Sequence, residues 1–138
     1  MALVLDTGPI LALLDANDRH HAACVQMVRE VAEALVVPAA TLVEVDYWVH
    51  KRLTPPVWRA FVEDVAAGAY RLEAADETDM VRACEISERY ADLRIGFVDA
   101  SVIALCERLG ERKVATLDRR DFAVVVPRHV PALELLPH

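Results

Sequence analysis

Two aspartates directly follow short apolar segments that have the pattern of buried strands, and they are the first residues with a possible chemical role. Asp6 comes after the apolar run 2–5, and Asp118 comes after the run 114–117. In open α/β sheets, ligands bind outside the carboxyl ends of the strands. Both aspartates are therefore expected at the edge of the sheet where binding sites form.

Two further carboxylates lie among apolar or small residues. Asp99 stands at the start of a predicted helix in the segment 96–101, and Glu44 lies in the apolar stretch 39–45. A lone buried charge is unfavourable and neighbouring carboxylates repel one another, so a cluster of them persists when a cation neutralises it. Oxygen ligands suit Mg²⁺ or Mn²⁺. Such a cation can bind a phosphate oxygen, lower the pKa of water and stabilise a leaving 3′ oxygen.

Each of these carboxylates also has a purely structural interpretation. Asp118 can be an ordinary turn residue after a strand, Asp99 can favour the dipole at a helix start, and Glu44 can pair with a nearby arginine. Asp6 is harder to explain in this way, because Thr7 is available to cap the following helix. Four carboxylates in compatible places favour one shared site over four separate explanations.

Short apolar strands separated by helices are predicted along the chain. Strands are expected at 2–5, 35–37, 70–72 and 114–117, with weaker candidates at 123–126 and 133–136. Helices are expected from Thr7, from a cap at Asn17 or Asp18 to about Glu33, from Pro38, and from Pro55 to Gly68. Two more helices place Met80, Cys84, Ser87 and Ala91 on one face and Val98, Val102, Leu105 and Leu109 on another. This alternation predicts an α/β fold with a short, mostly parallel central β-sheet flanked by helices, in a single domain over 1–138.

The composition fits a folded domain that is acidic overall. Of 138 residues, 55% are hydrophobic, and the net charge is −7. Binding of nucleic acid by charge alone calls for a basic protein, so either nucleic acid is not the partner or the acidity has a local role such as holding cations. No apolar run approaches the roughly 18 residues of a membrane span. The three cysteines form no paired motif, which predicts a cytoplasmic protein with reduced thiols, with Cys84 and Cys106 as small core residues.

In four segments the chain resembles the PIN domain family, and more narrowly the VapC toxins of bacterial toxin–antitoxin pairs. The segments are 4–15, 41–45, 98–104 and 115–122, and together they span essentially the whole chain. None is specific alone, but their order and spacing are. In the first segment Gly8 stands where many relatives have serine, which changes the turn and leaves the carboxylates in place.

The resemblance implies a metal-dependent endoribonuclease that uses Mg²⁺, with Mn²⁺ as a substitute. It makes Asp6, Glu44, Asp99 and Asp118 an acidic quartet. In it Asp6, Asp99 and Asp118 hold one or two metal ions, and Glu44, alone or with Asp118, orients the attacking water. Thr116 supports the site by a hydrogen bond to Asp6, and Thr7 is a second candidate for such support. The products carry 5′-phosphate and 3′-hydroxyl ends.

The resemblance also implies partners: an RNA substrate, a cognate antitoxin protein and a second copy of the chain in a homodimer, with no membrane contact. Part of the acidity then belongs to the metal site, and RNA contact rests on local basic residues. These candidates, each of which can equally be ordinary surface charge, are Lys51, Arg52, Arg94, Arg119 and Arg120. Asp46 and Asp121 are treated as auxiliary carboxylates outside the quartet.

Three other functions are compatible with parts of the pattern. A phosphatase of the haloacid dehalogenase type also opens with a strand ending in Asp, but it needs a second Asp two residues on, where this chain has Gly8. A PIN domain can bind partners or RNA without cutting, although here all four acidic positions are filled. A PIN-type RNA-binding or RNA-processing protein outside any toxin–antitoxin pair remains the main alternative.

Overall fold

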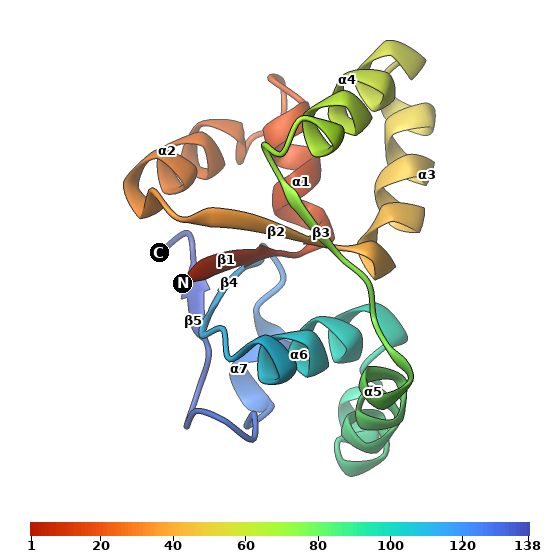
Figure 1. Cartoon of the computed structure of the whole chain (residues 1–138), viewed down its shortest axis with the longest axis vertical. Coiled ribbons are helices and arrows are strands. Elements are labelled where there is room, and N and C mark those ends of the chain that lie inside the picture. The colour runs from red at the N-terminus through yellow and green to blue at the C-terminus, as the bar shows by residue number, and fades with distance from the viewer.

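A five-stranded sheet lies at the centre of the protein in the computed structural model, which describes all 138 residues (Figure 1). The strands are β1 (Ala2–Leu5), β2 (Ala34–Pro38), β3 (Arg71–Glu73), β4 (Lys113–Ala115) and β5 (Glu134–Leu136). Their order across the sheet is β3-β2-β1-β4-β5. Every neighbouring pair is parallel, so the predicted α/β class with a short parallel sheet is confirmed.

Helices cover both faces of this sheet. They are α1 (Thr7–Leu14), α2 (His21–Val31), α3 (Leu42–Arg52), α4 (Pro55–Ala66), α5 (Glu77–Arg89), α6 (Phe97–Leu109) and α7 (Arg120–Val124), with short 3-10 turns at Ala39–Thr41 and Ala91–Leu93. Figure 1 shows α1 to α4 on one face and α5 to α7 on the other. No helix is both long and apolar enough to cross a membrane.

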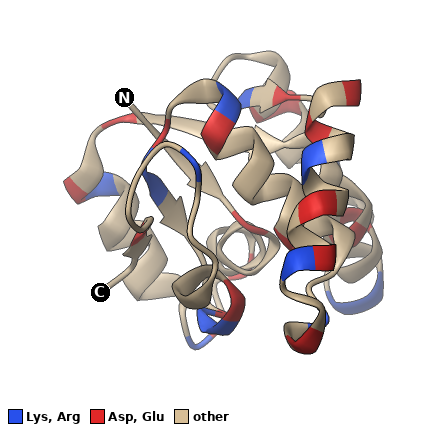
Figure 2. Ribbon diagram, turned by 90° about the horizontal axis from the view of Figure 1, so that it is seen from below, with Lys and Arg blue, Asp and Glu red and all other residues tan.

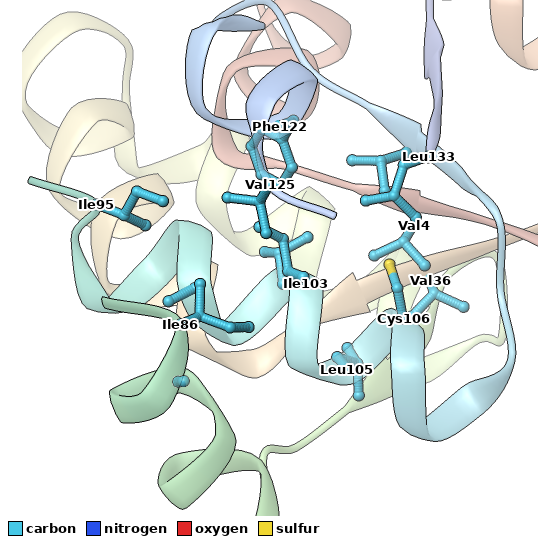
Figure 3. Close-up of a cluster of buried hydrophobic side chains, with 14 of the residues drawn as sticks. Val4, Val36, Ile86, Ile95, Ile103, Leu105, Cys106, Phe122, Val125 and Leu133 are labelled. Carbon is cyan, nitrogen blue, oxygen red and sulfur yellow. The ribbon is translucent and has the colours of Figure 1, made fainter. Parts of the chain in front are cut away.

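Alternation along the strands divides the core into two halves. Val4 and Val36 point into a cluster with α5, α6 and α7, which Figure 3 shows, whereas Leu3, Leu5 and Val37 point into a cluster with α1 to α4. Because side chains in a strand alternate between faces, a slip of one residue would exchange the two sets. Full burial of one such side chain stabilises the fold by about 1.5–3 kcal/mol, so the register is strongly specified.

The central position of β1 brings its carboxyl end next to that of β4. Leu5 pairs with Ala115, and the ladder continues one residue further, because the backbone N–H of Asp6 donates to the carbonyl oxygen of Ala115 at 2.9 Å. Asp6 and Thr116 therefore leave the sheet side by side.

The predicted buried face of α5 is wrong. The helix buries Asp79, Ala83 and Ile86, whereas Met80 and Cys84 are exposed. The reason is a paired aspartate: the side chain of Asp79 is only 3% exposed and accepts a hydrogen bond from Arg108 Nε at 2.9 Å. A sequence pattern that counts every charged residue as solvent-facing places this helix face about one residue out of phase.

The predicted strand at 123–126 is also wrong, because most of this segment belongs to α7 and its C-cap. It lies in the connection between β4 and β5, which are parallel neighbours. Such a connection must leave the sheet and cross over it. The apolar residues Phe122 and Val125 are buried against α6 instead of in the sheet. The weak candidate strand near the C-terminus is confirmed as β5.

Two predicted helix starts differ from the structure. The cap expected at Asn17 or Asp18 is absent, since α2 begins at His21 and Asp18 Oδ1 instead accepts the backbone N–H of His20 at 2.7 Å within the preceding turn. Pro38 is the last residue of β2, and α3 begins at Leu42 after a 3-10 turn. The predicted restart at Pro55 is confirmed.

Candidate active site

Asp6 and Thr116 form the buried floor of the site. Asp6 is 7% exposed and Thr116 is fully buried. The Thr116 hydroxyl lies 3.0 Å from Asp6 Oδ2 and 2.9 Å from the carbonyl oxygen of Asp118, and the N–H of Asp118 donates back to it at 3.2 Å. A hydroxyl has one proton to donate and lone pairs to accept, so Thr116 can donate to Asp6 while it accepts from Asp118 N–H, which ties the carboxyl group of Asp6 to the loop that carries Asp118. The hydrogen bond predicted from Thr116 to Asp6 is present.

Thr7 does not cap α1, contrary to the sequence-based prediction. Asp6 occupies the N-cap position with an extended backbone (φ −77°, ψ 168°), and no side chain caps the helix. The Thr7 hydroxyl instead donates to Glu44 Oε1 at 2.9 Å. Glu44 lies in the first turn of α3 and is exposed, so its expected burial in an apolar stretch is wrong. Its partner is a hydroxyl group, and the arginine alternative is not observed.

Asp99 brings a carboxylate to the same site from α6, which covers the other face of the sheet. It lies in the first turn of α6 and is half-buried. Burial, followed by the charges of Asp6, Asp121 and Asp118, raises the pKa of Asp99 to about 7. Burial also raises the pKa of Asp6, with smaller contributions from Glu44 and Asp118, and the Thr7 N–H and Thr116 hydroxyl oppose that rise. Asp6, Glu44, Asp99 and Asp118 thus lie close enough for their charges to affect the pKa of Asp6 or of Asp99.

Asp121 is a further buried carboxylate beside this group, and sequence reasoning gave it little weight. It is 5% exposed, lies in the first turn of α7, and is one of the groups that raise the pKa of Asp99. The other auxiliary, Asp46, is half-exposed and pairs with His50 on α3 at 3.0 Å.

The donor set fits a hard divalent cation. All of the converging groups are carboxylates, whose oxygens are the ligands that Mg²⁺ and Mn²⁺ prefer. Burial, followed by the charges of neighbouring carboxylates, raises the pKa of Asp6 and of Asp99, and Asp121 Oδ1 is buried without a hydrogen-bond partner. As they stand, no three or more His, Cys, Asp or Glu side chains close into a complete metal-binding group.

The basic residues considered for RNA contact are exposed. The five candidates for RNA contact, all exposed, are Lys51, Arg52, Arg94, Arg119 and Arg120. The guanidinium of Arg52 stacks on Trp48 at 4.1 Å from the ring centre, and Arg120 Nε lies 3.5 Å from Asp121 Oδ1. In the view of Figure 2, acidic and basic positions are interspersed without a broad basic face.

The Thr116→Val substitution is expected to raise the pKa of Asp6 further. The Thr116 hydroxyl stabilises the Asp6 carboxylate by its hydrogen bond and so opposes the rise that burial causes. An NMR titration of the Asp6 carboxyl carbon measures this directly. Thr41→Val is the matched control, since Thr41 is equally buried but donates to the carbonyl of Pro38 at 2.8 Å. An Asp6 pKa that does not distinguish the two variants would remove Thr116 from the site.

Comparison with known proteins identifies a matching family model and a related sequence. Residues 3–126 match the family model described as PIN domain. Ribonuclease VapC26 of Mycobacterium tuberculosis (strain ATCC 25618 / H37Rv) is 34% identical over 125 residues, which cover 91% of this chain and 93% of that relative.

Solved structures share the fold at lower identity. The crystal structure of Mycobacterium tuberculosis VapC20, a sarcin–ricin loop cleaving toxin, gives a TM-score of 0.78 at 18% identity and covers 86% of this chain and 92% of that chain. VapBC2 from Rickettsia felis, bound to a DNA fragment from its promoter, gives 0.69 at 12% identity and covers 99% and 98%. FitAcB from Neisseria gonorrhoeae gives 0.65 at 21% identity, with 87% and 90% covered.

Proposed function

The chain belongs to the PIN domain family, and from that premise we propose that it is a metal-dependent endoribonuclease toxin of the VapC type. One observation carries the proposal. Asp6, Glu44, Asp99 and Asp118 come from four separate segments and converge at one end of the sheet, where Asp99 has a pKa of about 7. Repulsion between neighbouring carboxylates destabilises the metal-free protein, and a bound cation would relieve it.

The proposed reaction is in-line hydrolysis of an RNA phosphodiester. Asp6, Asp99 and Asp118 would hold Mg²⁺, or Mn²⁺ in its place, and the ion would neutralise phosphate charge and stabilise the leaving 3′ oxygen. Glu44 is exposed and is oriented by Thr7, so its carboxylate can accept the proton of an attacking water. Thr116 keeps the carboxylate of Asp6 in one orientation. The products would carry 5′-phosphate and 3′-hydroxyl ends.

The proposed protein partners are an antitoxin and a second copy of the chain, and we place their action in the cytoplasm with the RNA substrate. An acidic site of this kind attracts an arginine from an inserted peptide, because arginine pairs with carboxylates in a fixed geometry. On α3, Val43 and Tyr47 are 77% and 54% exposed beside Glu44, and exposed apolar surface of this kind suits a protein contact. Growth arrest on expression, relieved by a small protein from a neighbouring reading frame, would distinguish a toxin from an RNA-processing PIN domain.

Removal of the metal is expected to stop RNA cleavage completely and reversibly. The purified protein is incubated with structured RNA in Mg²⁺, in EDTA, and in EDTA followed by excess Mg²⁺, and the RNA ends are identified by labelling. Cleavage should occur only with Mg²⁺, return on its re-addition, and leave 5′-phosphates. Cleavage that persists in EDTA, or leaves 2′,3′-cyclic phosphates, would contradict a metal-dependent hydrolysis.

A further inference from the structure

Phe97 is an exposed aromatic residue at the first position of α6. It is 53% exposed, whereas the other two phenylalanines of the chain, Phe61 and Phe122, are 1% and 2% exposed. Phe97 belongs to neither of the two core clusters and pairs with no other aromatic ring. The ring therefore contributes little to the stability of the fold, and much of its surface is free to contact a ligand.

The direction of α6 brings Phe97 to the end of the sheet where the carboxylates lie. A helix that leads into a parallel strand runs back along the sheet, and α6 leads into β4. In the short connection between them, Glu111 Oε2 accepts the backbone N–H of Ala2 at 2.8 Å, which fixes the C-terminal end of α6 beside the first residue of β1. The helix has 13 residues and is about 20 Å long, so its N-terminal end lies at the carboxyl ends of the strands.

Phe97 and Asp99 lie in the same first turn of α6. Two residues apart on a helix, their Cα atoms are separated by about 5.5 Å, and helical side chains tilt toward the N-terminal end. The residue before them, Gly96, adds no side chain, and even a Cβ atom there would have no atom within 4 Å. The ring of Phe97 therefore stands at the open rim of the site, next to the carboxylate of Asp99.

An RNA base is the ligand that suits an aromatic ring at this place. Single-stranded RNA is bound through unstacked bases that lie on aromatic side chains. A phosphodiester held at Asp99 has a base on each side of it, close to the ring. The nearest cation along the chain, Arg94, is exposed and is available to neutralise a neighbouring phosphate.

We propose that Phe97 is a substrate-binding residue, and that a base next to the cleaved phosphodiester stacks on its ring. The inference rests on the proposed function, because it places the phosphodiester at Asp99. It assigns to the site a contact with a base, whereas the carboxylates act at the phosphate. Because every base has a π face, stacking tolerates all four, so Phe97 should favour unpaired RNA over a duplex without selecting one sequence.

The Phe97→Ala substitution is expected to raise KM for a single-stranded RNA about 5- to 100-fold, the range for loss of one stacked base. The value of kcat should stay close to that of wild type, because the lost contact binds the substrate without acting on the reacting atoms. Phe97→Trp should keep the wild-type KM, since an indole also stacks, and Phe97→Leu should behave like Phe97→Ala. Val62→Ala on α4, where Val62 is 45% exposed, is the control and should change neither constant.

An RNA that lacks one base tests the contact itself. Once the cleaved bond is mapped, an abasic nucleotide replaces the nucleotide on either side of it. Binding is measured by fluorescence anisotropy with Asp99→Asn protein, which should cut too slowly to interfere. Removing the stacked base should weaken binding when Phe97 is present and have no further effect in Phe97→Ala, because both changes remove the same interaction.

Three results would overturn the proposal. The first is additive losses from the abasic RNA and Phe97→Ala, and the second is a Phe97→Leu variant that binds RNA like wild type. The third is unchanged RNA binding by Phe97→Ala together with a changed oligomeric state in light scattering, which would assign the ring to a protein contact.

The outcomes also separate this inference from the proposed function. If RNA is cleaved in Mg²⁺ and Phe97→Ala has no effect on KM, the role of Phe97 fails and the nuclease stands. If no RNA is cleaved but RNA binding depends on Phe97, the nuclease fails and the stacking contact stands. A protein that neither binds nor cuts RNA would contradict both.

Discussion

Replacing Asp99 with asparagine is expected to lower kcat/KM for RNA cleavage by about 10³-fold while making the metal-free protein more stable. Stabilisation of the transition state by a metal ion is worth several kcal/mol, and each 1.4 kcal/mol corresponds to a factor of about ten in rate. The stability gain at pH 8 should be on the order of 2 kcal/mol, because the carboxylate that burial and neighbouring charges disfavour is removed.

The measurement pairs single-turnover cleavage of a labelled RNA with urea unfolding in EDTA. Asp92→Asn is the control, since Asp92 is exposed in the 3-10 turn Ala91–Leu93. A general loss of fold would lower activity and stability together. If Asp99→Asn cuts as fast as wild type, the cleavage belongs to a contaminant and the assigned site is wrong.

Affinity for the divalent cation is expected to fall about tenfold for each pH unit below about 7. The pKa of Asp99 in the folded protein is about 7, against an ordinary value of 3.8. A carboxylate must lose its proton to bind metal, so protons compete with the cation below pH 7 and cease to compete above it. Between pH 7 and pH 5 the expected loss is on the order of 100-fold.

The raised pKa of Asp99 also determines whether the stability of the metal-free protein rises or falls with pH. Between about pH 4 and pH 7, the unfolded chain releases this proton while the folded, metal-free protein keeps it. The contribution of Asp99 to stability is therefore full below about pH 4, declines as the pH rises to about 7, and changes no further above that. Calorimetric Mn²⁺ titrations from pH 5 to 8, with urea unfolding at the same values, measure both effects. An affinity independent of pH over this range would contradict the account.

Much of the site could be predicted because short sequence patterns indicate where its residues lie. An apolar run followed by Asp6, and another followed by Thr116 and Asp118, indicate strands whose carboxyl ends meet at one edge. The structure confirms that β1 and β4 are neighbours and that Thr116 bonds to Asp6. The positions of these two strands depend on a few adjacent residues, so they can be predicted from the sequence.

Features set by tertiary contacts could not be predicted in this way. Glu44 is exposed and held by Thr7, because the 3-10 turn before α3 delays the helix by several residues. The burial of Asp79 depends on Arg108, 29 residues away. Asp121 was weighed equally with Asp46, because only the crossover from β4 to β5 turns its segment into a helix beside Asp99.

The most direct test of the central claim, that these carboxylates hold a catalytic divalent cation, is anomalous diffraction from crystals of the protein soaked in Mn²⁺. The account predicts a Mn²⁺ peak at the carboxyl ends of β1 and β4, with oxygens of Asp6 and Asp99 at about 2.1 Å from the ion, a typical distance for a small divalent cation. A crystal of protein that cleaves RNA with Mn²⁺, but shows no peak at these residues or shows its peak elsewhere, would contradict it.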